Sequence, residues 1–192
     1  IFTLNILLVE FGAADLSGAG AALGSVTQIG PLVTVLIVAG AGATAICADL
    51  GARTIREEID AMRVLGIDPV HRLVVPRVVA SCLVALLLNG MVVAIGLVGG
   101  FYFSVYVQNV TPGAYVSSLT LVTGLPEVIL SEVKAGLFGL IAALVASYRG
   151  LTVSGGPKGV GTAVNETVVY AFVALFAVNV VLTAVGVKVT AG

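Results

Sequence analysis

Charge is scarce in this sequence. Asp, Glu, Lys and Arg make up 10% of the 192 residues, whereas 59% are hydrophobic and the mean hydropathy is +1.16. A soluble domain carries about 25% charged residues, so this chain cannot cover a water-facing surface. Residues 16–48, 78–126 and 167–187 contain no charged residue, and a membrane-spanning helix needs about 20 mostly apolar residues. The sequence therefore predicts an all-α, polytopic integral membrane protein.

Residues that usually form metal or nucleophile sites are also few. The chain has one histidine, two cysteines and no tryptophan. Cys47 and Cys82 fall in or beside predicted spans, where thiols act as small apolar fillers more often than as disulfides or metal ligands. We expect His71 to be a solvated loop residue. The sequence thus predicts no metal site and no catalytic site, and its net charge of −1 does not indicate a nucleic-acid partner.

A signal peptide is not evident at the start of the sequence. Ile1 is not an initiator methionine, and no basic segment precedes the first apolar run. Residues 1–11 are apolar but too short to span a membrane. We expect them to be the tail of a first transmembrane helix that begins upstream, in a longer protein.

The apolar runs predict four further spans. The run at 16–48 is too long for one straight crossing, and Pro31 removes a helical hydrogen bond, so we expect a bent helix that ends near Asp49. The other spans are expected at 71–105, 127–148 and 165–187. The connection before the 127–148 span is predicted to be a turn followed by a segment that runs back toward the membrane and ends at Pro126. The connection after that span is predicted to be a Gly-rich loop at 149–166.

One charged stretch stands out from this apolar background. Nine of the chain's 19 charged residues lie within 51–77. Ile55, Ile59 and Met62 recur at the i, i+4, i+7 spacing of a single helix face. The stretch is either a solvated connector that only fixes orientation or a docking helix for a soluble partner. We favour docking, because a connector needs only a few polar residues.

The same stretch contains signals for a helix stop and a helix start. Gly66 suits the left-handed position that follows a helix. Asp68 and Pro69 are typical of an N-cap followed by proline at the first helical position. We therefore predict a coupling helix and loop over 51–70, and then a helix that returns to the membrane.

Basic residues predict the orientation. Five arginines lie in 51–77, and Arg149 and Lys158 lie in 149–166, whereas 12–18 and 106–126 contain none. Cytoplasmic loops carry an excess of Lys and Arg, so both basic segments are predicted to be cytoplasmic. The C-terminus then lies on the periplasmic side.

Three charged residues are candidates for an intramembrane role: Glu127, Glu132 and Lys134. Ionisable residues inside a membrane segment are functional by default, and Glu127 and Lys134 share a helix face at a spacing of seven. The alternative is that they lie at interface depth and are hydrated. The sequence favours neither.

The segment EEIDAMRVLGIDPVHRLVVPR (57–77) resembles the MlaE/YrbE permease family, the membrane subunits of lipid-transporting ABC systems. Segments 28–62, 148–169 and 176–185 support the resemblance, which covers essentially the whole chain as a single permease domain. Within this family, the sequences of these segments most resemble the actinobacterial YrbE proteins that work with Mce proteins, and in particular their B-type member.

The resemblance implies partners and a mechanism. It implies an A-type permease partner, a cytoplasmic ATPase dimer that binds the ATP and Mg²⁺, an Mce substrate-binding assembly, and a lipid substrate such as a fatty acid in the bacterial inner membrane. This chain would have no cofactor of its own. The implied ATPase-coupling residues are Glu57, Glu58, Ile59, Asp60, Met62, Arg63, Leu65, Gly66, Asp68 and Pro69.

The sequence departs from the family at two charged positions. Many members carry Arg-Glu where this chain has Thr27 and Gln28, and another family arginine is Ala41 here, so charge contacts at those positions do not transfer. Two other classes remain open: a secondary transporter driven by an ion gradient, and a membrane scaffold of a cell-envelope complex.

Overall fold

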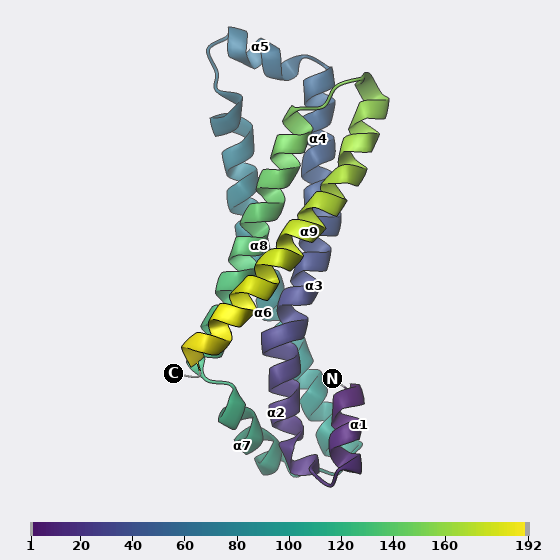
Figure 1. Cartoon of the computed structure of the whole chain (residues 1–192), viewed down its shortest axis with the longest axis vertical. Coiled ribbons are helices and arrows are strands. Elements are labelled where there is room, and N and C mark those ends of the chain that lie inside the picture. Colours follow the sequence, from purple (N-terminus) through teal and green to yellow (C-terminus); the bar gives the residue numbers. More distant parts are fainter. Residues whose placement is uncertain (1, 191–192) are drawn as a thin grey trace. The chain divides into compact units, whose positions relative to one another are not determined.

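All of the regular structure in the described residues is helical. The computed structural model describes residues 2–190, except for the side chains of Phe2, Leu4, Asn5, Val9 and residues 187–190. The side chain of Lys188, one of the basic residues, thus lies outside the described part. Four helices are long and apolar enough to cross a membrane: Ala14–Ile55, Val70–Tyr106, Leu125–Leu151 and Gly156–Gly186. The predicted all-α, polytopic membrane fold is confirmed (Figure 1).

The elements follow one another with short connections. A short helix, α1 (Phe2–Glu10), precedes the first candidate span, and α5 (Glu58–Val64) and α7 (Pro112–Val122) are short helices between spans. The α-helices that make up the candidate spans are, in chain order, α2 (Ser17–Ala22), α3 (Gly30–Ile37), α4 (Ala43–Ile55), α6 (Val75–Tyr106), α8 (Leu125–Leu151) and α9 (Gly156–Thr190).

The first candidate span is one continuous helix with two π-helical turns, at Leu23–Ile29 and Val38–Gly42. The first turn directly precedes Gly30-Pro31, where proline cannot donate a backbone hydrogen bond. In the second, the Thr44 hydroxyl donates to the carbonyl oxygens of Gly40 (2.6 Å) and Ala41 (3.0 Å). Proline and π-bulges are recognised causes of helix bending.

This helix ends at Ile55, six residues beyond the predicted end near Asp49. The polar residues in this extension form helix-compatible contacts. Arg53 pairs with Asp49 one turn away at 3.3 Å, and the Thr54 hydroxyl donates to the Leu50 carbonyl oxygen. Local pairing between i and i+4 therefore extends the helix past the apolar run.

Two other predicted boundaries are wrong. Pro126 lies in the first turn of α8 and does not end the preceding segment, because proline is tolerated where the N–H has no intrahelical partner. The predicted Gly-rich loop at 149–166 is mostly helical, since α8 continues to Leu151 and α9 begins at Gly156. The turn needs few residues because Gly155 and Gly156 adopt φ values of +83° and +70°, which glycine tolerates readily.

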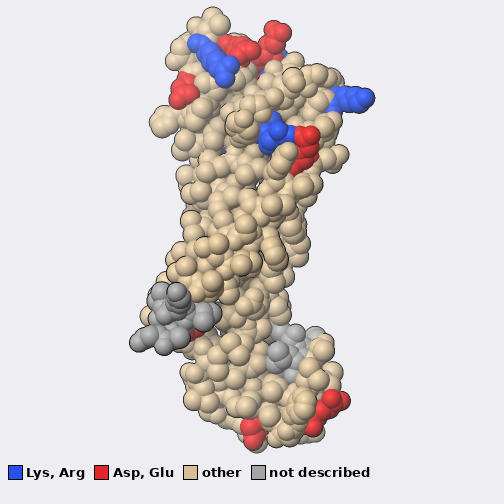
Figure 2. Space-filling model, in the orientation of Figure 1, with Lys and Arg blue, Asp and Glu red and all other residues tan. Residues whose placement is uncertain are grey.

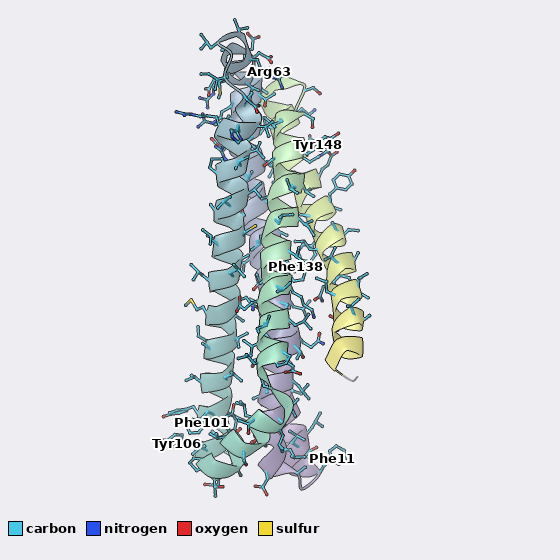
Figure 3. All side chains as sticks on the ribbon, turned by 90° about the vertical axis from the view of Figure 1, so that its left-hand side faces the viewer. Phe11, Arg63, Phe101, Tyr106, Phe138 and Tyr148 are labelled. Atoms are coloured by element: carbon cyan, nitrogen blue, oxygen red, sulfur yellow. The ribbon has the colours of Figure 1, made fainter. Side chains whose placement is uncertain are left out.

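The described chain divides into two compact units. Unit 1 comprises Ile1–Val33, Leu87–Val133 and Gly186–Gly192, and unit 2 comprises Thr34–Leu86 and Lys134–Val185. In unit 1, the ring of Tyr115 is buried with Ala21 and Val110 and meets Phe101 edge-on at 5.3 Å. In unit 2, Phe138 is fully buried (Figure 3).

Small residues bring the helices of unit 2 close together. Gly150 on α8 lies against Leu50 and Cys47 of α4, and the Thr54 hydroxyl donates to the Gly150 carbonyl oxygen at 3.1 Å. Cys47 is buried and accepts a hydrogen bond from the Thr167 hydroxyl of α9 at 3.2 Å. These contacts place the α4–α5 turn and the α8–α9 turn at the same end of unit 2.

Candidate functional site

The charged stretch folds as two helices separated by a left-handed residue. α4 ends at Ile55 and α5 begins at Glu58, with Glu57 between them at φ +59°. The prediction that Ile55, Ile59 and Met62 form one stripe of a single helix is therefore wrong. The chain turns at Glu57, and ion pairs from Arg53 (3.5 Å) and Arg56 (3.4 Å) to Glu58 cross the turn.

The C-terminal end of α5 forms a Schellman motif. The Ile67 amide donates to the Met62 carbonyl oxygen at 2.9 Å, and the Gly66 amide donates to that of Arg63 at 3.0 Å. Gly66 has φ +74°, which confirms its predicted left-handed conformation. Both bonds satisfy carbonyl groups that a helix end otherwise leaves unpaired.

The next helix starts where the sequence predicted. The Asp68 side chain accepts a hydrogen bond from the Val70 amide at 3.0 Å, and Pro69 is the first helical residue. A π-helical turn at Val70–Val74 then leads into α6. The N-cap at Asp68 is confirmed, so the link from the end of α5 to the next helix is fixed by short-range bonds.

The side chains of α5 and of the turn after it divide into a buried anchor and an exposed apolar surface. Ile59 is 3% exposed, and so its side chain packs within the chain. Beyond it, Val64 is 89% exposed, Leu65 75% and Ile67 43%. We call these last three residues the α5 apolar tip. A contiguous exposed apolar patch outside a membrane span can mark a protein interface.

Charged residues surround the α5 apolar tip. Asp60 and Arg63 form an ion pair at 2.8 Å on the exposed part of the helix. Figure 2 shows acidic and basic side chains gathered over the end of unit 2 that carries α5. An apolar centre with a polar rim is the usual anatomy of a protein interface.

The sequence-based residue set covers most of this surface and misses part of it. The structure brings Glu57, Leu65, Gly66 and Asp68 to the exposed surface of one short segment. Val64 and Ile67 were not predicted, although three apolar residues among the four at 64–67 lie off the Ile59–Met62 face. That departure from helical periodicity is the sequence signal that could have identified this exposed apolar surface.

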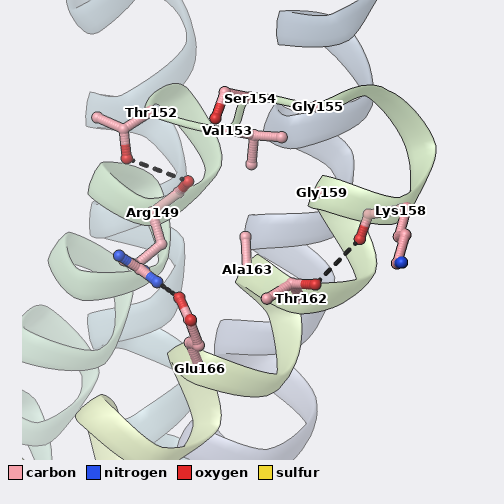
Figure 4. Close-up of a pocket in the computed structure, with 10 residues that line it drawn as sticks. All are labelled: Arg149, Thr152, Val153, Ser154, Gly155, Lys158, Gly159, Thr162, Ala163 and Glu166. Atoms are coloured by element: carbon pink, nitrogen blue, oxygen red, sulfur yellow. Dashed lines mark hydrogen bonds and ion pairs between the residues drawn. The ribbon is translucent and has the colours of Figure 1, made fainter.

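The α8–α9 turn lines an open pocket of about 440 Å³ (Figure 4). Arg149 forms an ion pair with Glu166 across it, and the Arg149 guanidinium lies 5.2 Å from the ring centre of Tyr170. Lys158 also lines it. These contacts fix α8 against α9 at the end of unit 2 that carries the basic residues.

The three candidate intramembrane charges have separate partners. Glu127 accepts a hydrogen bond from the Gly124 amide at 2.8 Å, so it caps the start of α8. Glu132 accepts from the Asn89 side-chain amide at 3.2 Å. Lys134 is 3% exposed, and its ammonium donates to the Thr183 hydroxyl of α9 at 2.9 Å.

These placements distinguish the three residues. A capping carboxylate at a helix start has a local structural role. For Glu127 this favours the alternative of a hydrated residue at interface depth over a role inside the membrane. Lys134 is buried inside a candidate span, so the hydrated-interface reading does not describe it. His71 is exposed, and the described residues contain no group of three or more His, Cys, Asp or Glu side chains placed to hold a metal ion.

Comparisons with known proteins agree on one family. The family model described as Permease MlaE matches residues 1–185. A probable ABC transporter permease of Synechocystis is 31% identical over 185 residues, covering 95% of this chain and 70% of that protein. A probable ABC transporter permease of Rickettsia typhi is 35% identical, over 81% of this chain and 60% of that protein. The intermembrane phospholipid transport system permease MlaE of Haemophilus influenzae is 26% identical, over 94% of this chain and 69% of that protein.

Proposed function

Because the chain belongs to the MlaE permease family, we propose that it is the membrane subunit that couples a separate cytoplasmic ATPase to lipid movement. The substrate class we propose is a fatty acid or related long-chain lipid. The proposed assembly contains a second, A-type permease, an ATPase dimer and Mce substrate-binding proteins, in the bacterial inner membrane with the C-terminus on the periplasmic side. ATP and Mg²⁺ belong to the ATPase and not to this chain.

The observation that carries this proposal is the α5 apolar tip. A seven-residue helix that ends in a Schellman motif and the turn directly after it present Val64, Leu65 and Ile67 outside the candidate spans, just before the Asp68 cap. The buried Ile59 anchors this helix to its own chain. Movement of a partner bound at the tip is thereby transmitted to α4 and α6, the helices that flank α5.

Both basic turns support the same orientation. The α4–α5 and α8–α9 turns lie at one end of unit 2 and carry Arg56, Arg63, Arg149 and Lys158. A cytoplasmic position for this end satisfies the positive-inside rule and places α5 where a soluble ATPase can reach it. From that end the chain crosses three more times, through α6, α8 and α9, and so ends on the opposite side.

The experiment is to place a charge on the tip in the full-length complex. We expect Val64→Glu and Leu65→Glu to lower lipid-stimulated ATPase activity in proteoliposomes about tenfold, a loss of about 1.4 kcal/mol of interface energy. Val107→Glu is the matched control, because Val107 is 60% exposed and lies just beyond the second candidate span. Membrane abundance of all three variants should equal that of the wild type.

Two outcomes would point to the other function classes. Lipid transfer that is unchanged by the tip variants, and that depends on an ion gradient, favours a secondary transporter. A complex that purifies without any ATPase favours a membrane scaffold. The coupling proposal fails in either case.

A further inference from the structure

A second concave surface lies on unit 2, away from the α5 apolar tip. It is an open groove of about 430 Å³, within the range of about 300–1,000 Å³ typical of ligand sites. One wall comes from the first candidate span and the other from α6. The lining residues are Ile37, Val38, Ala41, Gly42 and Ile46 on the first wall, and Arg77, Ala80, Ser81 and Val84 on the second.

The π-helical turn at Val38–Gly42 forms the first wall of this groove. Gly42 contributes no side chain, and a Cβ atom added there would meet only a Val38 methyl group at 4.0 Å. The Thr44 hydroxyl donates hydrogen bonds to the carbonyl oxygens of Gly40 and Ala41 in this turn, so the groove surface itself stays apolar. π-Bulges in helices are frequent at functional sites.

The rest of the groove is suited to a hydrocarbon chain. Ile37 is 43% exposed and Val84 57% exposed, and both belong to candidate spans. The groove is therefore open toward the side where lipid tails lie. An acyl chain seated in it gains dispersion contacts on two walls, which a tail in bulk lipid obtains only from mobile neighbours.

Arg77 gives this groove a polar end. It is the one charged residue among the described residues that line the groove, and it lies seven residues after the start of the Val70–Tyr106 span. Its guanidinium donates to the Leu73 carbonyl oxygen at 2.7 Å and pairs with Asp49. A guanidinium has five N–H donors, so these two bonds leave donors for a further anion.

The surrounding ion pairs carry a net positive charge. Asp49 pairs with both Arg53 and Arg77, and Glu58 pairs with Arg53 and Arg56. Three arginines therefore share two carboxylates, which leaves one positive charge. Arginine binds phosphate through paired N–H bonds.

We propose that this groove binds one acyl chain of an anionic phospholipid from the leaflet on the α5 side, with its phosphate at Arg77. The site lies within a single permease subunit and is distinct from the α5 apolar tip. It does not rest on the proposed coupling function, because a bound lipid there needs no ATPase.

The test is photo-crosslinking in the full-length protein. The protein is placed in nanodiscs of phosphatidylcholine that contain a trace of phosphatidylglycerol with a diazirine on its acyl chain, and the labelled peptides are mapped by mass spectrometry. We expect label on 37–46 and 80–84. Replacing the phosphatidylglycerol probe by the matching phosphatidylcholine probe should lower labelling about tenfold, which corresponds to about 1.4 kcal/mol of binding free energy.

Two pairs of variants separate the tail and the headgroup. Gly42→Leu fills the groove and should abolish the label, whereas Gly40→Leu, on the same turn but outside the lining, should retain it. Arg77→Gln should remove the preference for phosphatidylglycerol. Arg53→Gln takes one positive charge from the same network but none of the donors that line the groove, so it should keep most of that preference.

Three results would overturn the proposal. Equal labelling of Gly42→Leu and Gly40→Leu would show contact with bulk lipid alone. Equal labelling by both probes in the wild-type protein would exclude headgroup recognition. Absence of label together with a disulfide between Val84→Cys and a second permease subunit would show that a helix covers the groove. None of these results bears on ATPase coupling, which the α5 variants test separately.

Discussion

The ammonium group of Lys134 on α8 donates a hydrogen bond to the hydroxyl of Thr183 on α9 at 2.9 Å, and Thr183 in turn donates to the Asn179 carbonyl oxygen at 2.7 Å. The bonded residues lie 49 positions apart in the chain, and Lys134 is 3% exposed. A buried charge inside a membrane segment is costly and usually functional. This bond therefore joins two spans at a point where a pair of apolar side chains would avoid the cost of burying a charge.

Lys134→Met tests whether this residue serves function and not stability. Methionine has similar length and no charge to desolvate, so we expect the free energy of unfolding to stay unchanged or to rise by about 1–4 kcal/mol. Lipid transfer in proteoliposomes should fall. Thermal unfolding in detergent and transfer of a fluorescent lipid measure the two effects.

Thr183→Val is the control for the hydrogen-bond partner of Lys134. It removes the acceptor from a buried charge, so we expect a loss of about 1–3 kcal/mol. Adding Lys134→Met to Thr183→Val should recover most of that loss. A large destabilisation by Lys134→Met alone would show that the lysine is structural.

Gly66→Ala tests the left-handed end of α5. A Cβ atom at φ +74° costs about 1–2 kcal/mol, so the Schellman bonds should weaken and hydrogen exchange of the Gly66 and Ile67 amides should become faster. We expect lipid-stimulated ATPase activity to fall while the protein remains in the membrane. Gly161→Ala is the matched control: it lies inside α9, where a Cβ atom meets nothing within 4 Å, and it should stabilise the fold by about 0.5–1 kcal/mol.

Gly139→Ala tests the close approach of α8 to α6 in unit 2. The added Cβ atom would lie 2.5 Å from the Ser81 carbonyl oxygen and 2.9 Å from the Ala85 Cβ atom. We expect a loss of about 1–3 kcal/mol, because a well-packed interface cannot absorb the volume without moving. At Gly136, three residues earlier, the nearest atom is a Leu86 methyl group at 3.5 Å, so Gly136→Ala should leave the melting temperature nearly unchanged. Equal shifts would mean that the two helices are not packed as described.

Tyr115→Phe tests the core of unit 1. The Tyr115 hydroxyl donates to the Leu97 carbonyl oxygen at 3.0 Å, and its loss should cost about 0.5–1.5 kcal/mol. Burial raises the pKa of Tyr115 above its ordinary value of 10.0, so the folded state holds the proton longer than the unfolded state. Its contribution is complete below pH 10.0 and is lost as the pH rises toward the folded pKa. Melting temperatures measured at pH 8 and above pH 10 should diverge for the wild type more than for Tyr115→Phe.

The local stop and start signals of the α5 region were readable in the sequence. The left-handed Gly66 and the Asp68 cap depend on neighbours within five residues, and such short-range rules hold in most tertiary contexts. The four apolar spans were equally accessible, because hydrocarbon forces the backbone to satisfy its own hydrogen bonds within a helix.

Other features of the site were not readable in this way. The sequence placed Ile55 and Ile59 on one helix face, but the chain turns at Glu57, where ion pairs to Glu58 span the turn. It included Ile59 among the coupling residues without showing that its side chain is buried, and it missed Val64 and Ile67 at the exposed tip. Helical periodicity identifies a face but does not say what covers that face.

By itself, then, the sequence determined that this is an all-helical membrane protein, where its charges gather and how the α5 segment stops and restarts, since each of these follows from composition or from bonds between near neighbours. Tertiary structure decided that Lys134 bonds to Thr183 on another span, that Gly150 lies against Leu50 and Cys47, and that the Val38–Gly42 turn and α6 enclose a groove ending at Arg77. Those relationships join residues tens of positions apart, and the spacing of residues along one helix does not specify which helix packs against it.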